Sequence, residues 1–519
     1  MMIVSLWERR VRAIPILVLL IIAMTILTEI AQQRGAEYDE GYTVLLASGD
    51  PRPDWPGVPF QAGAERGVFA GHSGALQIAR DLRRTDVHPP LYFWAAAGWR
   101  TLAGPRLVML RLLSVLLGVA ALGVVVWIAT LAGVPPLPAA LLTLGCYGFS
   151  YTAAVARGFA LAELLMLLGA ALVLTAERRR RGPLAPALAL AGGVLLGLAT
   201  FANYLACFVA GAALLWLLLR AWRRPARWLA AGIGFAAVLP ADLWFFLAQR
   251  DSRVGQFPPF HLLASLARLA QYAAGAVFGG LPLYVGGAAR LALGAALALL
   301  LLALAALIAW RWRWLGRPGA RWLLLLAAVA PPVGLILLGM AFNNTPIELR
   351  YLAFATPFFA LLLAGALATL APRRRAVALG LLLAVQAAAL AGLAWRPETM
   401  QPQAAATRAA AALAGPQGLV LIPRGNDGVG VVAAVIQSAP DWLRLLVVPR
   451  DMPPEAIRAR AGNAPVVVLA LLGVDGDSRA TLPQMEAAFR DQPCWHAAGQ
   501  GPDVLAYARD PACAPSAAR

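Results

Sequence analysis

The sequence predicts an all-α polytopic membrane protein, with about eleven transmembrane helices and a small α/β domain at its carboxyl end. Three observations predict this fold class. Of the 519 residues, 60% are hydrophobic and only 13% are charged, and the mean hydropathy is +0.69. Ordinary globular domains carry about 25% charged residues. The apolar residues gather in runs of membrane length, and the composition changes sharply beyond about residue 396.

Eleven apolar runs are long enough to span a bilayer, which takes roughly 20 residues. They cover 13–31, 107–132, 138–156, 158–176, 184–202, 204–220, 229–248, 286–309, 322–342, 352–371 and 376–395. Arginine clusters separate them at 9–12, 178–181, 220–227, 311–321 and 373–375. With eleven spans all these clusters fall on one side, which the positive-inside rule assigns to the cytoplasm. The net charge of +18 therefore reflects topology, and no nucleic-acid partner is expected.

The apolar stretch 89–104 predicts a helix lying in the membrane interface. A twelfth span here would move most arginine clusters to the outside. The stretch is short, begins with Pro89 and Pro90, and contains aromatic residues and Arg100, as interfacial helices do. A short tilted span is the alternative. Loop 32–106, which contains this stretch, then lies on the outer side of the membrane.

The sequence predicts two domains, a transmembrane domain over 1–395 and an extracytoplasmic α/β domain over 396–519. Within the second, the short apolar runs 418–422 and 466–470 predict buried strands, and 453–461 predicts a helix. The segment 425–428 predicts a turn. Cys494 and Cys513 can form a disulfide if this domain lies outside the cytoplasm.

Asp39 and Glu40 form an acidic pair shortly after the first apolar run. Ionisable residues beside a bilayer are costly, so they suggest a functional site. On a helix, adjacent side chains point about 100° apart, so one acid can be a base and the other an organiser. Apolar surroundings and a neighbouring acid can raise a carboxyl pKa toward the range of a general base. The alternative is that both acids cap a surface helix.

A family resemblance rests on motifs that occur in a fixed order. They are Tyr38-Asp39-Glu40-Gly41-Tyr42, His88-Pro89-Pro90, Ala156-Arg157-Gly158-Phe159, the segment 197–205 ending in Asn203-Tyr204-Leu205, and Leu349-Arg350-Tyr351. In this order the chain resembles the GT-C superfamily of polyprenyl-phosphate-sugar glycosyltransferases, in the protein mannosyltransferase and aminoarabinose transferase branch, which is glycosyltransferase family 39-like. The resemblance covers about residues 10 to 395. Two positions depart from the family pattern: Gly158-Phe159 replaces proline and a polar residue, and Asn203 replaces lysine or histidine.

The resemblance implies roles for particular residues. Asp39, with Glu40 beside it, deprotonates the acceptor hydroxyl so that the sugar is transferred with inversion. Arg157 and Arg350 lie at outer ends of spans, within reach of a lipid phosphate, so they are expected to bind the donor phosphate. His88 can bind the donor phosphate, support Asp39 or ligate a divalent ion. Tyr38, Tyr92, Tyr204 and Tyr351 are expected to line the groove for donor and acceptor. The alternatives are that the arginines anchor span ends, the histidine is a turn residue, and the tyrosines belong to an interfacial belt.

The implied function is an inverting membrane glycosyltransferase. It takes a sugar from a polyprenyl-phosphate donor, undecaprenyl phosphate in a bacterium, to an extracytoplasmic lipid, glycan or protein acceptor. Its expected place is the inner membrane, with the amino terminus cytoplasmic. The sequence requires no cofactor, although relatives that use a divalent cation leave one possible.

Two alternative functions are a lipid or glycan transporter or flippase, and a non-catalytic envelope scaffold. A transporter would favour buried charges within its spans. The spans here carry few, mainly Glu163 and Asp242, each expected to pair with a polar neighbour. Loop 249–285 is long enough to cover a site on the outer face.

Overall fold

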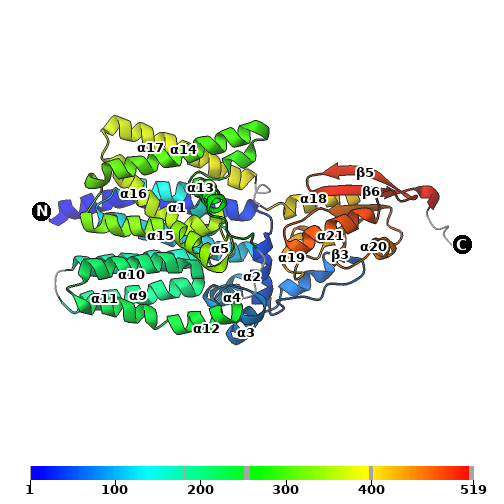
Figure 1. The fold of residues 1–519 in the computed structure, drawn as a ribbon, viewed down its shortest axis with the longest axis horizontal. Helices are drawn as coiled ribbons and strands as arrows, with labels where there is room; N and C mark the ends of the chain where they lie inside the picture. Colours follow the sequence, from blue (N-terminus) through cyan, green and yellow to red (C-terminus); the bar gives the residue numbers. More distant parts are fainter. Residues whose placement is uncertain (1, 180–181, 251–256, 397–400, 514–519) are drawn as a thin grey trace. The chain divides into compact units, whose positions relative to one another are not determined.

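The computed structural model describes residues 2–179, 182–250, 257–396 and 401–513, with side chains from residue 14 on. These residues form two compact units (Figure 1). The helical unit comprises residues up to 33, 82–92 and 110–396, and the sheet unit comprises 34–81, 93–109 and the residues from 397. Most of loop 32–106 thus belongs to the sheet unit. The predicted domain boundary at 395/396 borders residues 397–400, which lie outside the described residues.

Apolar helices, most of them long, make up most of the helical unit (Figure 1). They are α1 (Met2–Gln33), α5 (Leu107–Ala132), α6 (Pro136–Gly145), α7 (Tyr147–Ala153), α8 (Phe159–Arg178), α9 (Leu184–Ala202), α10 (Cys207–Ala221), α11 (Pro225–Ala236), α12 (Leu239–Gln249), α13 (Leu262–Phe278), α14 (Gly287–Arg311), α15 (Pro318–Phe342), α16 (Thr356–Ala368) and α17 (Pro372–Trp395). Short 3-10 turns precede α10, α14 and α16.

Within the described residues, nine helices are long and apolar enough to cross a membrane, or ten if the pair α11 and α12, bent by 41°, is one span. These correspond to ten of the eleven predicted spans. The chain is a multi-pass membrane protein, and the predicted fold class is confirmed. Of the arginine clusters, residues 180 and 181 and the side chains of 9–12 lie outside the described residues.

The prediction of a single span over 138–156 was wrong. The chain there forms two short helices, α6 and α7, which meet at Cys146 in an extended conformation. A break inside an apolar unit leaves backbone carbonyls that need donors. Ser150 Oγ donates to the Leu144 carbonyl at 2.5 Å, and Gln386 Nε2 donates at 3.4 Å to the Leu142 carbonyl, which also accepts the Cys146 N–H at 3.0 Å. Side-chain donors thus stabilise the backbone at the break. The uninterrupted run of apolar residues did not indicate a break at this position.

The sheet unit contains one six-stranded sheet with the order β1-β3-β2-β4-β6-β5. Its strands are β1 (Phe60–Gln61), β2 (Leu419–Pro423), β3 (Arg444–Val448), β4 (Val466–Ala470), β5 (Trp495–Gly501) and β6 (Val504–Arg509). Its helices are α2 (Tyr38–Ser48), α18 (Gln403–Ala414), α19 (Gly430–Ser438), α20 (Pro454–Ala461) and α21 (Gly476–Ala487), and α3 (Ala75–Thr85) and α4 (Leu91–Ala103) lie mostly in this unit.

The secondary structure predicted for the carboxyl end is confirmed. Strands β2 and β4 and helix α20 fall where the sequence placed them. The central strand β2 is parallel to both neighbours, with Leu421 opposite Leu446 of β3 and Leu469 of β4. All five β2 residues are buried, as continuous apolar runs in parallel sheets usually are. The predicted turn is present too, with Gly425 and Gly428 both at φ 73°, a conformation that glycine adopts without strain.

The first loop contributes directly to this sheet. Strand β1 pairs antiparallel with β3, with Phe60 opposite Leu445. Trp55 Nε1 donates to the Gly428 carbonyl, and Arg66 forms an ion pair with Asp441. Residues about 370 positions apart in sequence therefore fold as one unit.

Helix α4 confirms the helix expected over 89–104, although its Arg100 does not behave as an exposed interfacial cation. The Arg100 guanidinium is buried and donates to the carbonyls of Phe69, Gly71 and Pro105 at 2.8, 2.7 and 3.2 Å. These bonds fix the loop before α3 to the end of α4.

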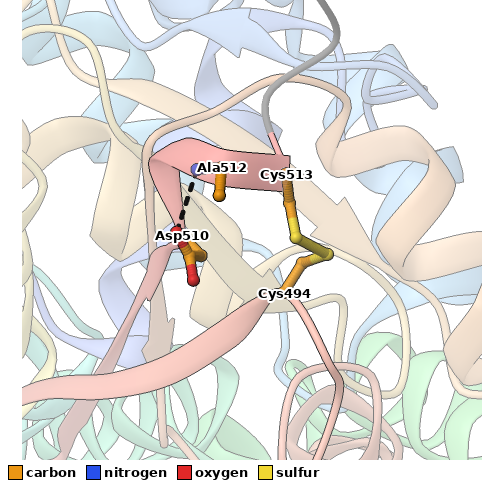
Figure 2. Close-up of a disulfide and its surroundings, with 4 residues drawn as sticks. All are labelled: Cys494, Asp510, Ala512 and Cys513. Carbon is orange, nitrogen blue, oxygen red and sulfur yellow. Dashed lines mark hydrogen bonds between the residues drawn. A yellow bond between two sulfur atoms is a disulfide. The ribbon is translucent and has the colours of Figure 1, made fainter.

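Cys494 and Cys513 form a disulfide, a pairing that the sequence left open (Figure 2). It joins the segment before β5 to the turn that follows β6. Beside it the Ala512 N–H donates to the Asp510 carboxylate at 2.9 Å. The disulfide therefore holds the end of the described chain against the segment before β5.

Replacing both cysteines by serine should make the sheet unit unfold at a lower temperature. A disulfide that closes a loop of this size, with a sequence separation of 19, contributes about 3 kcal/mol. Proteolysis of the full chain at rising temperature, read by mass spectrometry of peptides from 403–513, measures the change. Cys207→Ala, in α10 of the helical unit, is the control. An unaltered cleavage profile in the double variant would show that the bond contributes nothing.

Candidate functional site

A buried charge cluster lies in the helical unit, where the segment before α4 meets the turn before α8. His88 Nδ1 lies 3.0 Å from Asp86 Oδ1, and the Arg157 guanidinium lies 3.3 Å from His88 Nε2 and 3.6 Å from Asp86 Oδ2. The side chains of Asp86 and Arg157 are 5% and 3% exposed, so their charges compensate each other out of water. The structure thus brings together two predicted site residues, His88 and Arg157, through an acid that the sequence analysis missed.

Asp86 is held in its ionised form. Burial would raise its pKa, but the charges of His88 and Arg157, with hydrogen bonds from His88 and the Val87 N–H, lower the pKa below its ordinary value. The resulting stabilisation is present above the ordinary carboxyl pKa of about 3.9 and is lost only as the pH falls through the lower folded value. At neutral pH the cluster therefore keeps its carboxylate.

The position of Arg157 depends on close packing at the next residue. A Cβ at Gly158 would lie 2.5 Å from the Ala202 carbonyl oxygen and 3.4 Å from the Tyr92 Cβ. Any other residue there would push the turn away from α9. This accounts for the departure from the family pattern at position 158.

Gln249, the last residue of α12, links the charge cluster to Tyr204, another predicted site residue. Its Oε1 accepts the Tyr204 hydroxyl at 2.9 Å, while its Nε2 donates to the carbonyls of Leu82 and His88 at 2.9 and 3.1 Å. Asn203, the other departure from the family pattern, caps the following turn: its Oδ1 accepts the Leu205 N–H at 3.1 Å. No local sequence pattern indicates the role of Gln249, because its hydrogen-bond partners lie up to 167 residues away.

These residues border a cavity of about 200 Å³ in the helical unit. Its lining combines polar groups with apolar walls: His88, Asn203, Tyr204, Gln249, Arg250, Asn344 and Tyr351, with Val87, Leu205, Phe246, Phe257, Leu338, Phe342 and Pro346. Arg250 and Phe257 come from the predicted loop 249–285, of which residues 251–256 lie outside the described residues. A cavity with cationic, phenolic and aliphatic groups can hold an amphiphilic anion.

The remaining predicted residues of this unit are placed differently. Tyr351 lines the cavity, but Arg350 is not in its described lining and forms an ion pair with Glu348 at 2.7 Å. Tyr92 is fully buried, with its hydroxyl 3.3 Å from Ser114 Oγ, and is not in that lining either. The hydrogen bond to Ser114, a residue of α5, accounts for the position of the Tyr92 hydroxyl.

Asp242 and Glu163, the two acids expected inside spans, differ in their hydrogen bonding. Asp242 pairs with a polar neighbour, as predicted, and accepts a hydrogen bond from Thr200 Oγ1. Glu163 is equally buried, yet its Oε1 has no hydrogen-bond partner among the described residues. In the described part of the chain, no group of three or more His, Cys, Asp or Glu residues is arranged to hold a metal ion.

The acidic pair lies in the sheet unit, in the first turn of α2. Glu40 is fully buried, and its carboxylate accepts the Glu37 N–H at 3.1 Å, as in a capping box. Glu37 in turn forms a buried ion pair with Arg34. Asp39 is partly exposed. The two acids therefore have different surroundings, as their angular separation predicted.

Tyr38, predicted to line the groove, contacts the α/β part of the sheet unit. Its hydroxyl donates to Asp475 Oδ2 at 3.2 Å. This partner is 437 residues away, so no local pattern could have indicated it.

Comparison with solved structures identifies the fold. The chain is similar to ArnT from Cupriavidus metallidurans bound to undecaprenyl phosphate, with 13% identity and a TM-score of 0.52 over 96% of this chain and 98% of that chain. Against ArnT from the same organism in the apo state, identity is 15% and the TM-score is 0.53, over 95% and 97%. No protein-family model matches the chain, and no curated protein matches it significantly. The chain has the fold of ArnT, which agrees with the predicted resemblance to the aminoarabinose transferase branch.

Replacing Asp86 by Asn should destabilise the helical unit. The variant keeps the side-chain shape but removes the carboxylate that contacts His88 and Arg157, and breaking a buried pair costs on the order of 3–5 kcal/mol. The midpoint of thermal unfolding of the detergent-purified chain measures this loss. Asp54→Asn, at an exposed position in the sheet unit, should stay near wild type. Equal midpoints for the two variants would contradict the role given to Asp86.

Proposed function

We propose that this chain, which shares the fold of ArnT, is a GT-C integral membrane glycosyltransferase that takes a sugar from a polyprenyl-phosphate donor to an extracytoplasmic acceptor. The observation that carries the proposal is the lining of the cavity. His88 and Arg250 can meet a phosphate, phenolic and amide groups can bond to a sugar, and Phe246, Phe257 and neighbouring aliphatic residues suit a prenyl chain. The ArnT structure bound to undecaprenyl phosphate supports a lipid of this class.

In the proposed reaction, Asp39 accepts the proton of the acceptor hydroxyl. The freed oxygen attacks the anomeric carbon, the bond from that carbon to the phosphate oxygen breaks, and the polyprenyl phosphate leaves with the electron pair. This single displacement inverts the configuration at the anomeric carbon. Cationic groups near the phosphate stabilise the negative charge that develops on the leaving group.

The surroundings of the acidic pair support this division of roles. Glu40 is buried and its carboxylate is engaged by the backbone of its own helix, so it organises the first turn of α2. Asp39 is partly exposed on the same turn and is the better candidate for exchanging a proton with an acceptor.

Three arginines have different roles near the donor phosphate. Arg157 acts mainly through His88, which it contacts together with Asp86, so it orients the imidazole. Arg250, which lines the cavity, contributes the direct guanidinium contact to the phosphate. Arg350 acts through Tyr351, over whose ring its guanidinium lies at 5.6 Å.

The proposed location is the inner membrane, with the amino terminus in the cytoplasm and the sheet unit outside. The Cys494–Cys513 disulfide supports this side for the carboxyl end, because such bonds persist in oxidising compartments. The acceptor in that compartment is a lipid, a glycan or a protein.

Replacing Asp39 by Asn should abolish transfer without unfolding the chain. A general base contributes about 10²–10⁴-fold to the rate, so product should fall at least 100-fold. Cells lacking the protein are complemented with each variant, and envelope glycolipids and glycans are compared by mass spectrometry for the sugar that disappears.

The matched control for this experiment is Asp54→Asn, an exposed acid from the same loop. A transporter or scaffold would respond to neither change. Wild-type amounts of the sugar in cells carrying Asp39→Asn would therefore refute the transferase proposal.

Replacing Arg250 by Ala should weaken binding of undecaprenyl phosphate by roughly tenfold or more, because a hydrogen bond to a charged group contributes about 1.5–3 kcal/mol. Native mass spectrometry of the purified chain titrated with this lipid measures the affinity. Arg290→Ala, an exposed arginine outside the described lining, is the control. If both variants bind the lipid like the wild type, the cavity is not the phosphate site.

A further inference from the structure

The sheet unit has a potential ligand crevice of the kind found in open α/β sheets. From β2 the chain passes through α19 to β3 on one side, and then through α20 to β4 on the other. The direction in which successive strands are added to the sheet therefore reverses between β2 and β4. Ligands of such sheets bind outside the carboxyl ends of the strands at this point.

In this chain, helix α2 lies against that position. The Tyr42 hydroxyl donates to Asp427 Oδ2 at 2.5 Å, in the loop after β2. The Tyr38 hydroxyl donates to Asp475 Oδ2 at 3.2 Å, in the segment after β4. Two tyrosines one turn apart on α2 thus contact the two loops that would hold a ligand.

Glycine residues on both sides permit this contact. A Cβ at Gly41 of α2 would lie 3.0 Å from Ala433 Cβ and 3.3 Å from the Val429 carbonyl oxygen. A Cβ at Gly430, the first residue of α19, would lie 2.3 Å from the Tyr38 ring. The two helices therefore approach more closely than larger residues would allow.

The two acceptor carboxylates are fixed by their own loops. Asp427 Oδ1 accepts the Val429 N–H at 3.0 Å, and Asp475 caps α21 by accepting the Ser478 N–H at 2.7 Å. Burial, and then the charge of Asp427, raise the pKa of Tyr42, so its hydroxyl stays protonated and can donate. The contact is therefore directional as well as close.

We infer that the carboxyl-terminal α/β part of the chain positions the catalytic helix, with Tyr42 and Asp427 as the main positioning pair. Asp39 lies between Tyr38 and Tyr42 in sequence, so holding both tyrosines fixes the direction of its carboxylate. The inference rests on the proposed function for its catalytic consequence. The positioning itself is independent of any activity.

The test uses the full chain in lipid nanodiscs and four variants. Tyr42→Phe and Asp427→Ala remove the bond, whereas Asp427→Asn keeps an oxygen acceptor. Asp441→Ala is the matched control, because it removes the Arg66 ion pair, another contact between the first loop and the carboxyl-terminal residues. Backbone hydrogen exchange of peptides from 38–48 is measured, together with the envelope product described above.

Tyr42→Phe and Asp427→Ala should speed exchange in 38–48 at least tenfold and lower product about tenfold, while peptides containing β2 and β4 keep their protection. Asp427→Asn should restore both quantities to within about threefold of wild type, and Asp441→Ala should change neither. Unchanged exchange in 38–48, or faster exchange with normal product, would overturn the inference. If Asp39→Asn leaves product unchanged, the proposed function fails, and exchange alone decides whether α2 is held in this way.

Discussion

A charge buried among apolar groups is tolerated only when a partner compensates it, and this constraint shapes the irregular segments of the chain. Asp86 and Arg157 meet around His88 at the start of α4. Arg34 and Glu37 pair just before α2. In each case the ion pair lies where a helix begins or a turn interrupts the helices, so electrostatic compensation fixes the backbone that the apolar spans leave undetermined.

The same segments are where chemistry can occur. Within a bilayer, backbone outside a helix is tolerated where protein groups satisfy it or where it lines a cavity. The turn at Asn203 is capped by its own side chain, and the segment containing His88 is held by Gln249 through its backbone carbonyl. Both segments line the cavity. The departures from the family pattern at Gly158 and Asn203 therefore fit local packing and capping.

The sequence was sufficient for features that depend on local composition. Run lengths located ten of the eleven predicted spans, and short apolar runs located β2 and β4. It was insufficient for features that depend on distant partners. Nothing in the apolar run around Cys146 distinguishes a break from a continuous helix, because Gln386, which supplies one of the donors, is about 240 residues away. Asp86 and Gln249 were missed for the same reason.

Helix α2 shows why the acidic pair depends on the whole chain. It has 11 residues, and isolated helices shorter than about 12–15 residues are marginal in water. Its capping box orders only the first turn. The remaining stability must come from tertiary contacts, and those within the sheet unit include Tyr42 with Asp427 and Gly41 with Ala433. The placement of the helix that carries Asp39 thus depends on a residue 385 positions beyond Tyr42 in the chain, whereas the neighbouring sequence determines only that Asp39 lies on a helix.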